Sequence, residues 1–150
     1  ALSLLIAVGL ADFVPSGGWG GAAQFLDNGG DGYSHFRICE GGIATFDCRP
    51  PASMTAELNL GGCWYGSPST DPGYTMCPHP AKQNCDPVTG NCFAYIQAQC
   101  NGPQCSITID NGNMGGDPCP GVYKFAGVAL QCIYLPSAAN GNATKIARFK

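Results

Sequence analysis

The chain has 150 residues, a formal net charge of −3 and only 11% charged residues, while its 22 glycines and 12 prolines make up more than a fifth of it. This charge argues against nucleic acid as the main partner, because phosphate backbones are bound by clustered Lys and Arg. Glycine and proline at this density predict short elements joined by many turns, and a hydrophobic content of 45% argues against disorder.

The chain opens on an apolar run, ALSLLIAVGLA, over residues 1–11. The run is too short to cross a bilayer, so no transmembrane segment is predicted. It resembles the apolar core of a signal peptide, although an initiating Met and a basic leader are missing. Two placements stay open for residues 1–15: on the chain's own domain, or in a groove of a neighbouring copy as an added β-strand.

Glycine-rich stretches at 16–21 and 27–32 predict a connector that extends to residue 36. The second stretch, DNGGDG, is faintly similar to a calcium loop. However, Gly29 stands where an oxygen ligand is required, and Ile38 stands where a Glu closes such a loop. We therefore expect a cluster of turns here and no metal site.

Ten cysteines fall between residues 39 and 132, and no two have the C-x-x-C spacing of zinc ribbons. With only two histidines in the chain, five disulfides are a better account than a metal site, and each would stabilise the fold by about 2–4 kcal/mol. Disulfides at this density predict a secreted, extracellular protein. The cysteines are Cys39, Cys48, Cys63, Cys77, Cys85, Cys92, Cys100, Cys105, Cys119 and Cys132.

Short runs rich in β-branched and aromatic residues predict strands at 43–46, 54–60, 106–109 and 125–134. Residues 93–99 fit either a short helix or another strand. We expect a β-rich α+β fold, a small antiparallel β-sandwich with one or two short helices, stapled by disulfides. The predicted domain covers residues 37–135, and residues 136–150 form a tail.

The C-terminal half of the cysteine region carries a recognisable pattern. It runs from Cys100-Asn-Gly-Pro-Gln-Cys105 through Gly116-Asp-Pro-Cys-Pro-Gly-Val-Tyr-Lys124 to Cys132, and the N-terminal half adds Cys39-Glu-Gly41. Over about residues 38–134 the chain resembles the galactose/rhamnose-binding lectins of the sea-urchin-egg-lectin type. The resemblance implies a non-catalytic, metal-independent module that binds sugars or glycoconjugates and needs no cofactor.

The resemblance also implies a partial disulfide scheme. Cys48 is expected to pair with Cys132, and Cys100 with Cys105. Cys39 would pair with Cys63 or Cys77, and Cys119 with Cys85 or Cys92. The two remaining cysteines would form an additional bridge, and the sequence leaves these alternatives open.

The same resemblance implies a sugar site. Carboxylates accept hydrogen bonds from vicinal hydroxyls and an ammonium donates to a third oxygen, and such charge-assisted bonds are stronger than neutral ones. The implied residues are Glu40, Asn59, Asp117, Gly121 and Lys124.

One departure from the family weakens this site. Counted from Cys48, the family's A-N-Y-G-R stretch falls on residues 59–62, which puts Leu60 in place of a sugar-contacting Tyr and Gly62 in place of the Arg.

An enzyme is not expected, because neither His35 nor His79 has an adjacent nucleophile or an orienting partner in the sequence. An alternative function is structural: an extracellular filament of identical subunits, assembled head-to-tail through residues 1–15. Asn142, in the triplet Asn-Ala-Thr, is a predicted N-glycosylation site.

Overall fold

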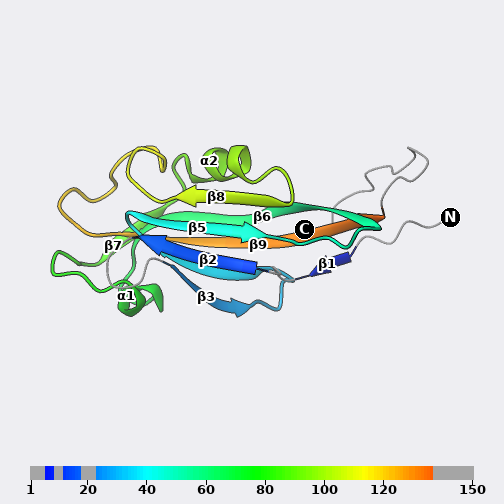
Figure 1. The fold of residues 1–150 in the computed structure, drawn as a ribbon. Helices are drawn as coiled ribbons and strands as arrows, with labels where there is room; N and C mark the ends of the chain where they lie inside the picture. The colour runs from blue at the N-terminus through cyan, green and yellow to red at the C-terminus, as the bar shows by residue number, and fades with distance from the viewer. Residues whose placement is uncertain (1–5, 9–11, 18–22, 137–150) are drawn as a thin grey trace.

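A computed structural model describes residues 6–8, 12–17 and 23–136 of the chain. The described residues form nine strands and two short helices (Figure 1). The strands are β1 (Ile6–Val8), β2 (Asp12–Gly17), β3 (Ala23–Asn28), β4 (Ser34–Cys39), β5 (Gly42–Asp47), β6 (Met54–Ser67), β7 (Cys85–Val88), β8 (Gln104–Thr108) and β9 (Phe125–Pro136). The helices are α1 (Gly73–Met76) and α2 (Cys92–Gln99).

The strands form two antiparallel sheets. The large sheet has the order β3-β4-β9-β6-β7, and the small sheet has the order β2-β5-β8. Strand β9 is the centre of the large sheet: β6 pairs along it from Pro136 to Phe125, while β4 pairs with residues 125–130 and β1 with residues 132–134. The large sheet therefore rests on one long ladder between β6 and β9.

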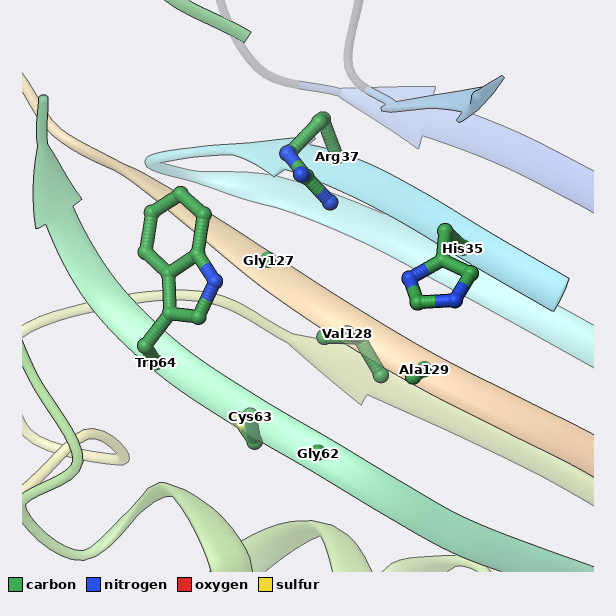
Figure 2. A pocket seen from close by; sticks show the side chains of 8 residues that line it. All are labelled: His35, Arg37, Gly62, Cys63, Trp64, Gly127, Val128 and Ala129. Carbon is green, nitrogen blue, oxygen red and sulfur yellow. The ribbon is translucent and has the colours of Figure 1, made fainter. Parts of the chain in front are cut away.

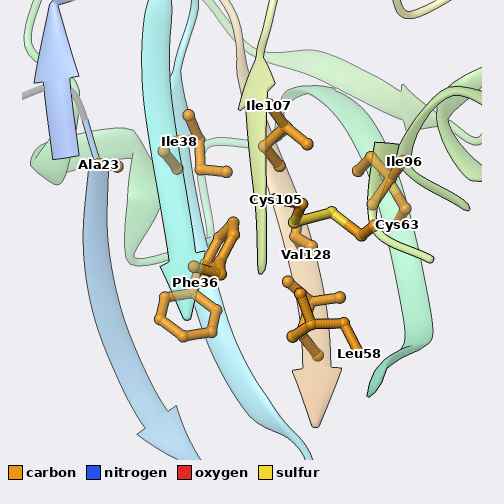
Figure 3. Packing of buried hydrophobic residues seen from close by; sticks show 14 of the residues in the cluster. Ala23, Phe36, Ile38, Leu58, Cys63, Ile96, Cys105, Ile107 and Val128 are labelled. Carbon is orange, nitrogen blue, oxygen red and sulfur yellow. A yellow bond between two sulfur atoms is a disulfide. The ribbon is translucent and has the colours of Figure 1, made fainter. Parts of the chain in front are cut away.

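The two sheets enclose a hydrophobic core, which Figure 3 shows in part. Phe36 of the large sheet meets Phe46 of the small sheet edge to face, with ring centroids 5.0 Å apart. Ile107, Val128 and Leu130 are at most 1% exposed in the same cluster. Two packed antiparallel sheets with short helices confirm the expected sandwich.

The segment that fits either helix or strand is a helix. In α2, Cys92 and Ile96 lie four residues apart on one face and are both fully buried in the core. The disulfide Cys63–Cys92 fixes this face against β6. In Figure 1, α1 and α2 lie on opposite sides of the sheets. No helix among the described residues is long and apolar enough to cross a membrane.

The five disulfides agree with the scheme implied by the resemblance and settle its open alternatives. Cys39 pairs with Cys77 rather than with Cys63, and Cys119 pairs with Cys85 rather than with Cys92. The complete set is Cys39–Cys77, Cys48–Cys132, Cys63–Cys92, Cys85–Cys119 and Cys100–Cys105.

The N-terminal region differs from the expected connector, because it supplies strands to both sheets. Strand β2 pairs with β5 at the edge of the small sheet, and β3 pairs with β4 at the edge of the large one. Pro15 has no backbone N–H, which an edge strand tolerates. Residues 6–8 pair with β9 of the same chain, the first of the two placements left open.

Candidate functional site

The structure brings together three of the residues singled out from the sequence: Glu40, Asp117 and Lys124, here called the charged cluster. The Lys124 ammonium lies 3.1 Å from Glu40 Oε1 and 3.0 Å from Asp117 Oδ1. It also donates a hydrogen bond to the Val122 carbonyl. Glu40 and Asp117 are 84 and 7 positions away from Lys124 in the sequence, and both carboxylates contact the same ammonium group.

Local backbone geometry places each member of this cluster. Glu40 lies in the tight turn between β4 and β5, where Gly41 has a φ of 81°. The backbone N–H of Glu40 donates to the Lys124 carbonyl at 2.9 Å, and the backbone N–H of Lys124 donates to Glu40 Oε1 at 2.9 Å. This reciprocal pair fixes the β4–β5 turn against the residue that precedes β9.

Asp117 is held by the loop between β8 and β9. Its Oδ1 accepts a hydrogen bond from the Cys119 backbone N–H at 3.0 Å, which closes an Asx-type turn over Pro118. The disulfide from Cys119 to Cys85 tethers this turn to β7. Gly121 follows, with a φ of 81° that favours glycine, and a Cβ there would meet no atom within 4 Å.

Burial divides the cluster into a covered cation and two accessible anions. The Lys124 side chain is 2% exposed, whereas the side chains of Glu40 and Asp117 are 26% and 29% exposed. A buried charge needs partners, and the three acceptors around Lys124 match the three donors of an ammonium. The resemblance led us to expect that this ammonium donates to a ligand. Instead its hydrogen bonds go to groups of the protein, and the carboxylates are the accessible groups.

The Asp117 carboxylate is held in its ionised form at neutral pH. Partial burial raises the pKa of Asp117, but hydrogen bonds from Lys124 and from the Cys119 N–H outweigh this effect, and the pKa lies below its ordinary value. The site therefore presents hydrogen-bond acceptors. Among the described residues, no group of three or more His, Cys, Asp and Glu side chains is arranged to hold a metal ion.

Tyr65 of β6 is a neighbour of the cluster that the sequence reasoning did not place there. Its ring lies under the Lys124 ammonium, which is 5.7 Å from the ring centroid, and its hydroxyl donates to Asn111 Oδ1 at 2.7 Å. The side chain is fully buried. Burial and the negative charges of Glu40 and Asp117 raise the pKa of Tyr65, so the hydroxyl remains a donor.

This position of Tyr65 corrects the register counted from Cys48. Leu60 pairs with Leu130 on the ladder and packs against the core, away from the charged cluster. The Tyr-Gly pair beside Lys124 is Tyr65-Gly66 instead. An aromatic residue therefore does lie beside the charged cluster, five positions beyond Leu60 on the same strand.

Asn59 does not belong to the charged cluster either. It pairs with Gln131 on the ladder, seven residues from Lys124 along β9, which is about 20 Å in a strand. Its amide donates to the Tyr33 hydroxyl at 3.1 Å and to Gln131 Oε1 at 3.3 Å. Asn59 is 7% exposed, so it serves a buried polar network. Asn142 lies outside the described residues.

The two histidines have partners that the sequence did not reveal. His79 stacks on Tyr123 with ring centroids 4.2 Å apart, and the Tyr123 hydroxyl donates to the Glu40 carbonyl at 3.0 Å. His35 Nε2 lies 3.3 Å from Asp31 Oδ1.

Comparisons with known proteins relate this chain to a lectin family. A family model described as the D-galactoside/L-rhamnose binding SUEL lectin domain matches residues 52–132, a range that includes Asp117 and Lys124 and begins after Glu40. A rhamnose-binding lectin of Silurus asotus is 28% identical over 98 residues, which cover 64% of this chain and 30% of the relative. The chain thus spans under a third of the length of this relative.

Proposed function

Because the chain belongs to the D-galactoside/L-rhamnose binding SUEL lectin domain family, we propose that it is a carbohydrate-binding module whose site is the charged cluster. Two carboxylates of separate loops converge on one buried ammonium while part of each stays exposed. This convergence is the observation that carries the proposal. A fixed pair of acceptors is what vicinal hydroxyls of a pyranose require.

In this site Glu40 and Asp117 accept hydrogen bonds from the sugar, and Lys124 is a positioning residue. Its ammonium holds the two carboxylates near each other and offsets their mutual repulsion. Gly121 leaves open space beside the Asp117 turn, since a Cβ there would meet no atom within 4 Å. The sugar therefore approaches over the β8–β9 loop, beside the exposed edges of the carboxylates.

The same arrangement supports binding without a metal. In many sites a divalent cation bridges acidic residues and a polyol, but here the Lys124 ammonium already lies about 3 Å from both carboxylates. Galactose-type and rhamnose-type sugars are the ligands we propose, and catalysis is not part of the proposal. Five disulfides support secretion, because such bonds persist in oxidising compartments.

A glycan array that compares wild type with Asp117→Asn and Lys124→Ala tests this function. We expect wild type to bind galactosides or rhamnosides, Asp117→Asn to bind them at least about tenfold more weakly, and Lys124→Ala to lose binding, since one charge-assisted hydrogen bond contributes 1.5–3 kcal/mol. The matched control is Asp27→Asn, an exposed carboxylate on β3. No sugar bound by wild type, or equal binding by all variants, would refute the site.

The pairing of β1 with β9 motivates a second candidate function, a filament. The three residues of β1 occupy a short stretch of the β9 edge beside β4. The same position accepts the equivalent residues of a neighbouring copy, and such head-to-tail exchange propagates because it does not close. Light scattering on the intact chain and on a chain lacking residues 1–15 tests this. Monomers in both cases would exclude a filament.

A further inference from the structure

A depression on the outer face of the large sheet has no part in the charged cluster. Figure 2 shows the side chains of His35, Arg37 and Trp64 standing around a floor of small residues on β9 and β6. The depression encloses about 130 Å³. Its remaining lining residues are Gly62, Cys63, Gly127, Val128 and Ala129.

Strand register builds this depression from two rows of residues. Arg37 pairs with Gly127, and Gly127 pairs with Trp64, so the two large side chains flank a glycine. In the next row on the same face, Ala129 lies between His35 and Gly62.

The position of the Trp64 indole requires a glycine at residue 127, in the first row. A Cβ on Gly127 would lie 2.3 Å from the Trp64 ring, so the indole leans across β9 in a way that a larger residue forbids. The Arg37 guanidinium carbon lies 5.1 Å from the centroid of the same ring. His35, Arg37 and Trp64 thus surround a floor of small residues. Because the strands fix the positions of these three side chains, the hollow has a fixed shape.

The charges around the hollow are internally neutralised. Arg37 forms a bidentate pair with Asp71, with distances of 2.8 Å from Nε and 3.0 Å from Nη2, and the Arg37 side chain is 11% exposed. His35 lies 3.3 Å from Asp31. A ligand in the hollow meets no unbalanced positive charge, which favours a neutral molecule over an anion.

Hydrogen-bond donors remain available at the walls. The Trp64 indole supplies one N–H donor, and its Nε1 lies over Gly127 in the floor of the hollow. The guanidinium of Arg37 has five N–H groups, of which Asp71 and the Phe36 carbonyl take three. The hollow thus combines an aromatic wall with donors, the combination that recognises a molecule with both apolar C–H faces and hydroxyl groups.

We propose that this hollow is a second carbohydrate site, which takes a single neutral pyranose residue. Its ring lies against Trp64 and Ala129, and its hydroxyls accept hydrogen bonds from Trp64 and Arg37. Trp64 and Tyr65 are consecutive residues of β6 and therefore project to opposite faces of the sheet. The second site and the charged cluster are thus on different sides of β6, and one domain can hold two glycan chains at once.

Gly62→Val tests the proposal, because it fills the floor with little disturbance. A Cβ at Gly62 would meet only the Ala129 Cβ, at 3.9 Å, and valine suits a strand. In amide NMR spectra, we expect methyl β-D-galactoside or methyl α-L-rhamnoside to shift the signals of Gly62, Gly127 and Ala129. These shifts should persist in Asp117→Asn, whereas in Gly62→Val the shifts of Gly127 and Ala129 should disappear. Gly102→Val, at a turn where a Cβ meets nothing within 4 Å, is the matched control and should keep them.

Fluorescence gives an independent readout. Trp19 and Trp64 are the two tryptophans of the chain, so Trp19→Phe leaves Trp64 as the reporter. We expect the glycoside to change this emission in Trp19→Phe and to have no effect once Gly62→Val is added.

Three outcomes would overturn the proposal: no shift of these amides with either neutral glycoside, shifts that survive Gly62→Val, or shifts produced by glucuronate or inorganic phosphate alone. The charged cluster is read from the amides of Glu40 and Lys124 in the same spectra. Failure of one site is therefore distinguishable from failure of the other.

Discussion

Two polar clusters lie along the β6–β9 ladder, and they differ in what they leave exposed. The charged cluster lies at the start of β9 and combines one buried cation with two partly exposed carboxylates. The second, here called the amide cluster, consists of Tyr33, Asn59 and Gln131, which are 6%, 7% and 2% exposed. Its amides bond to one another, to the Tyr33 hydroxyl and to the Gly32 carbonyl.

This difference suits the charged cluster to ligand binding and the amide cluster to holding the fold together. The amide N–H groups of Asn59 and Gln131 find acceptors inside the protein, and these bonds fix the turn before β4 onto the ladder. The charged cluster satisfies its cation completely and its anions only in part. Unsatisfied acceptors at the surface are what a polyol needs.

The strongest way to break this comparison is Lys124→Met, which leaves two carboxylates facing each other without a cation. We expect the free energy of unfolding to fall by about 3 kcal/mol, because removing one partner of a buried ion pair strands the others. Guanidinium denaturation with the disulfides intact measures it. Lys82→Met is the control, since the Lys82 ammonium bonds to the Cys77 carbonyl and lies over Tyr74. An equal loss in both variants would contradict the special role of Lys124.

A smaller effect is expected in the amide cluster. Asn59→Leu removes the donor to Tyr33 and to Gln131, and we expect a loss of about 1–2 kcal/mol in the free energy of unfolding. Adding Gln131→Met should recover part of this loss, because replacing both partners by apolar groups removes the stranded acceptor. Sugar binding at the charged cluster should be unchanged. A double variant less stable than the sum of the single ones would show that the cluster is not a simple neutral network.

Tyr65→Phe probes the support under the charged cluster. The ring and its contact with Lys124 remain, while the hydrogen bond to Asn111 is lost. We expect a loss of about 1 kcal/mol in the free energy of unfolding, measured by denaturation as above. A loss as large as that of Lys124→Met would mean that the hydroxyl, rather than the cation, organises this end of the ladder.

The smallest effect we expect concerns pH, and it distinguishes Asp117 of the charged cluster from Asn59 of the amide cluster. The pKa of Asp117 is lower in the folded chain than its ordinary value of 3.8. The stability it contributes is therefore present above about pH 4 and is lost as the pH falls through the folded-state pKa. Asp117→Asn should flatten the fall in unfolding free energy below pH 4, whereas Asn59→Leu should leave its shape unchanged. Identical pH profiles for wild type and Asp117→Asn would contradict the ionised pair.

The charged cluster was predictable because each of its residues lies in a short local pattern. Glu40 follows Cys39, Asp117 precedes Pro118-Cys119, and Lys124 follows Tyr123, so no counting over long stretches was needed. Tyr65 was missed because its position was counted from Cys48 across a loop whose length the sequence does not fix. A search for the Tyr-Gly pair itself would have found it.

The sandwich and four of its strands, β5, β6, β8 and β9, were also predictable, but β2, β3, β4 and β7 were not. Residues 12–17 include proline and glycine, which have low β-propensity, so nothing local indicates a strand. Their pairing is set by the free edge of β5, which is a tertiary effect. Similarly, α2 was ambiguous until the disulfide to Cys63 and the buried face of Ile96 decided it.

The Cys85–Cys119 bridge has a consequence for biosynthesis. Glu40 and Lys124 are placed by the ladder and the β4–β5 turn, but Asp117 lies in a loop whose covalent tether to the sheet is this one bridge. In a newly made chain that has not yet joined Cys85 to Cys119, the Asp117 turn lacks this tether, and the proposed sugar site would be incomplete. Sugar affinity would then mark chains that have finished oxidative maturation, and it would distinguish them from folded but immature ones.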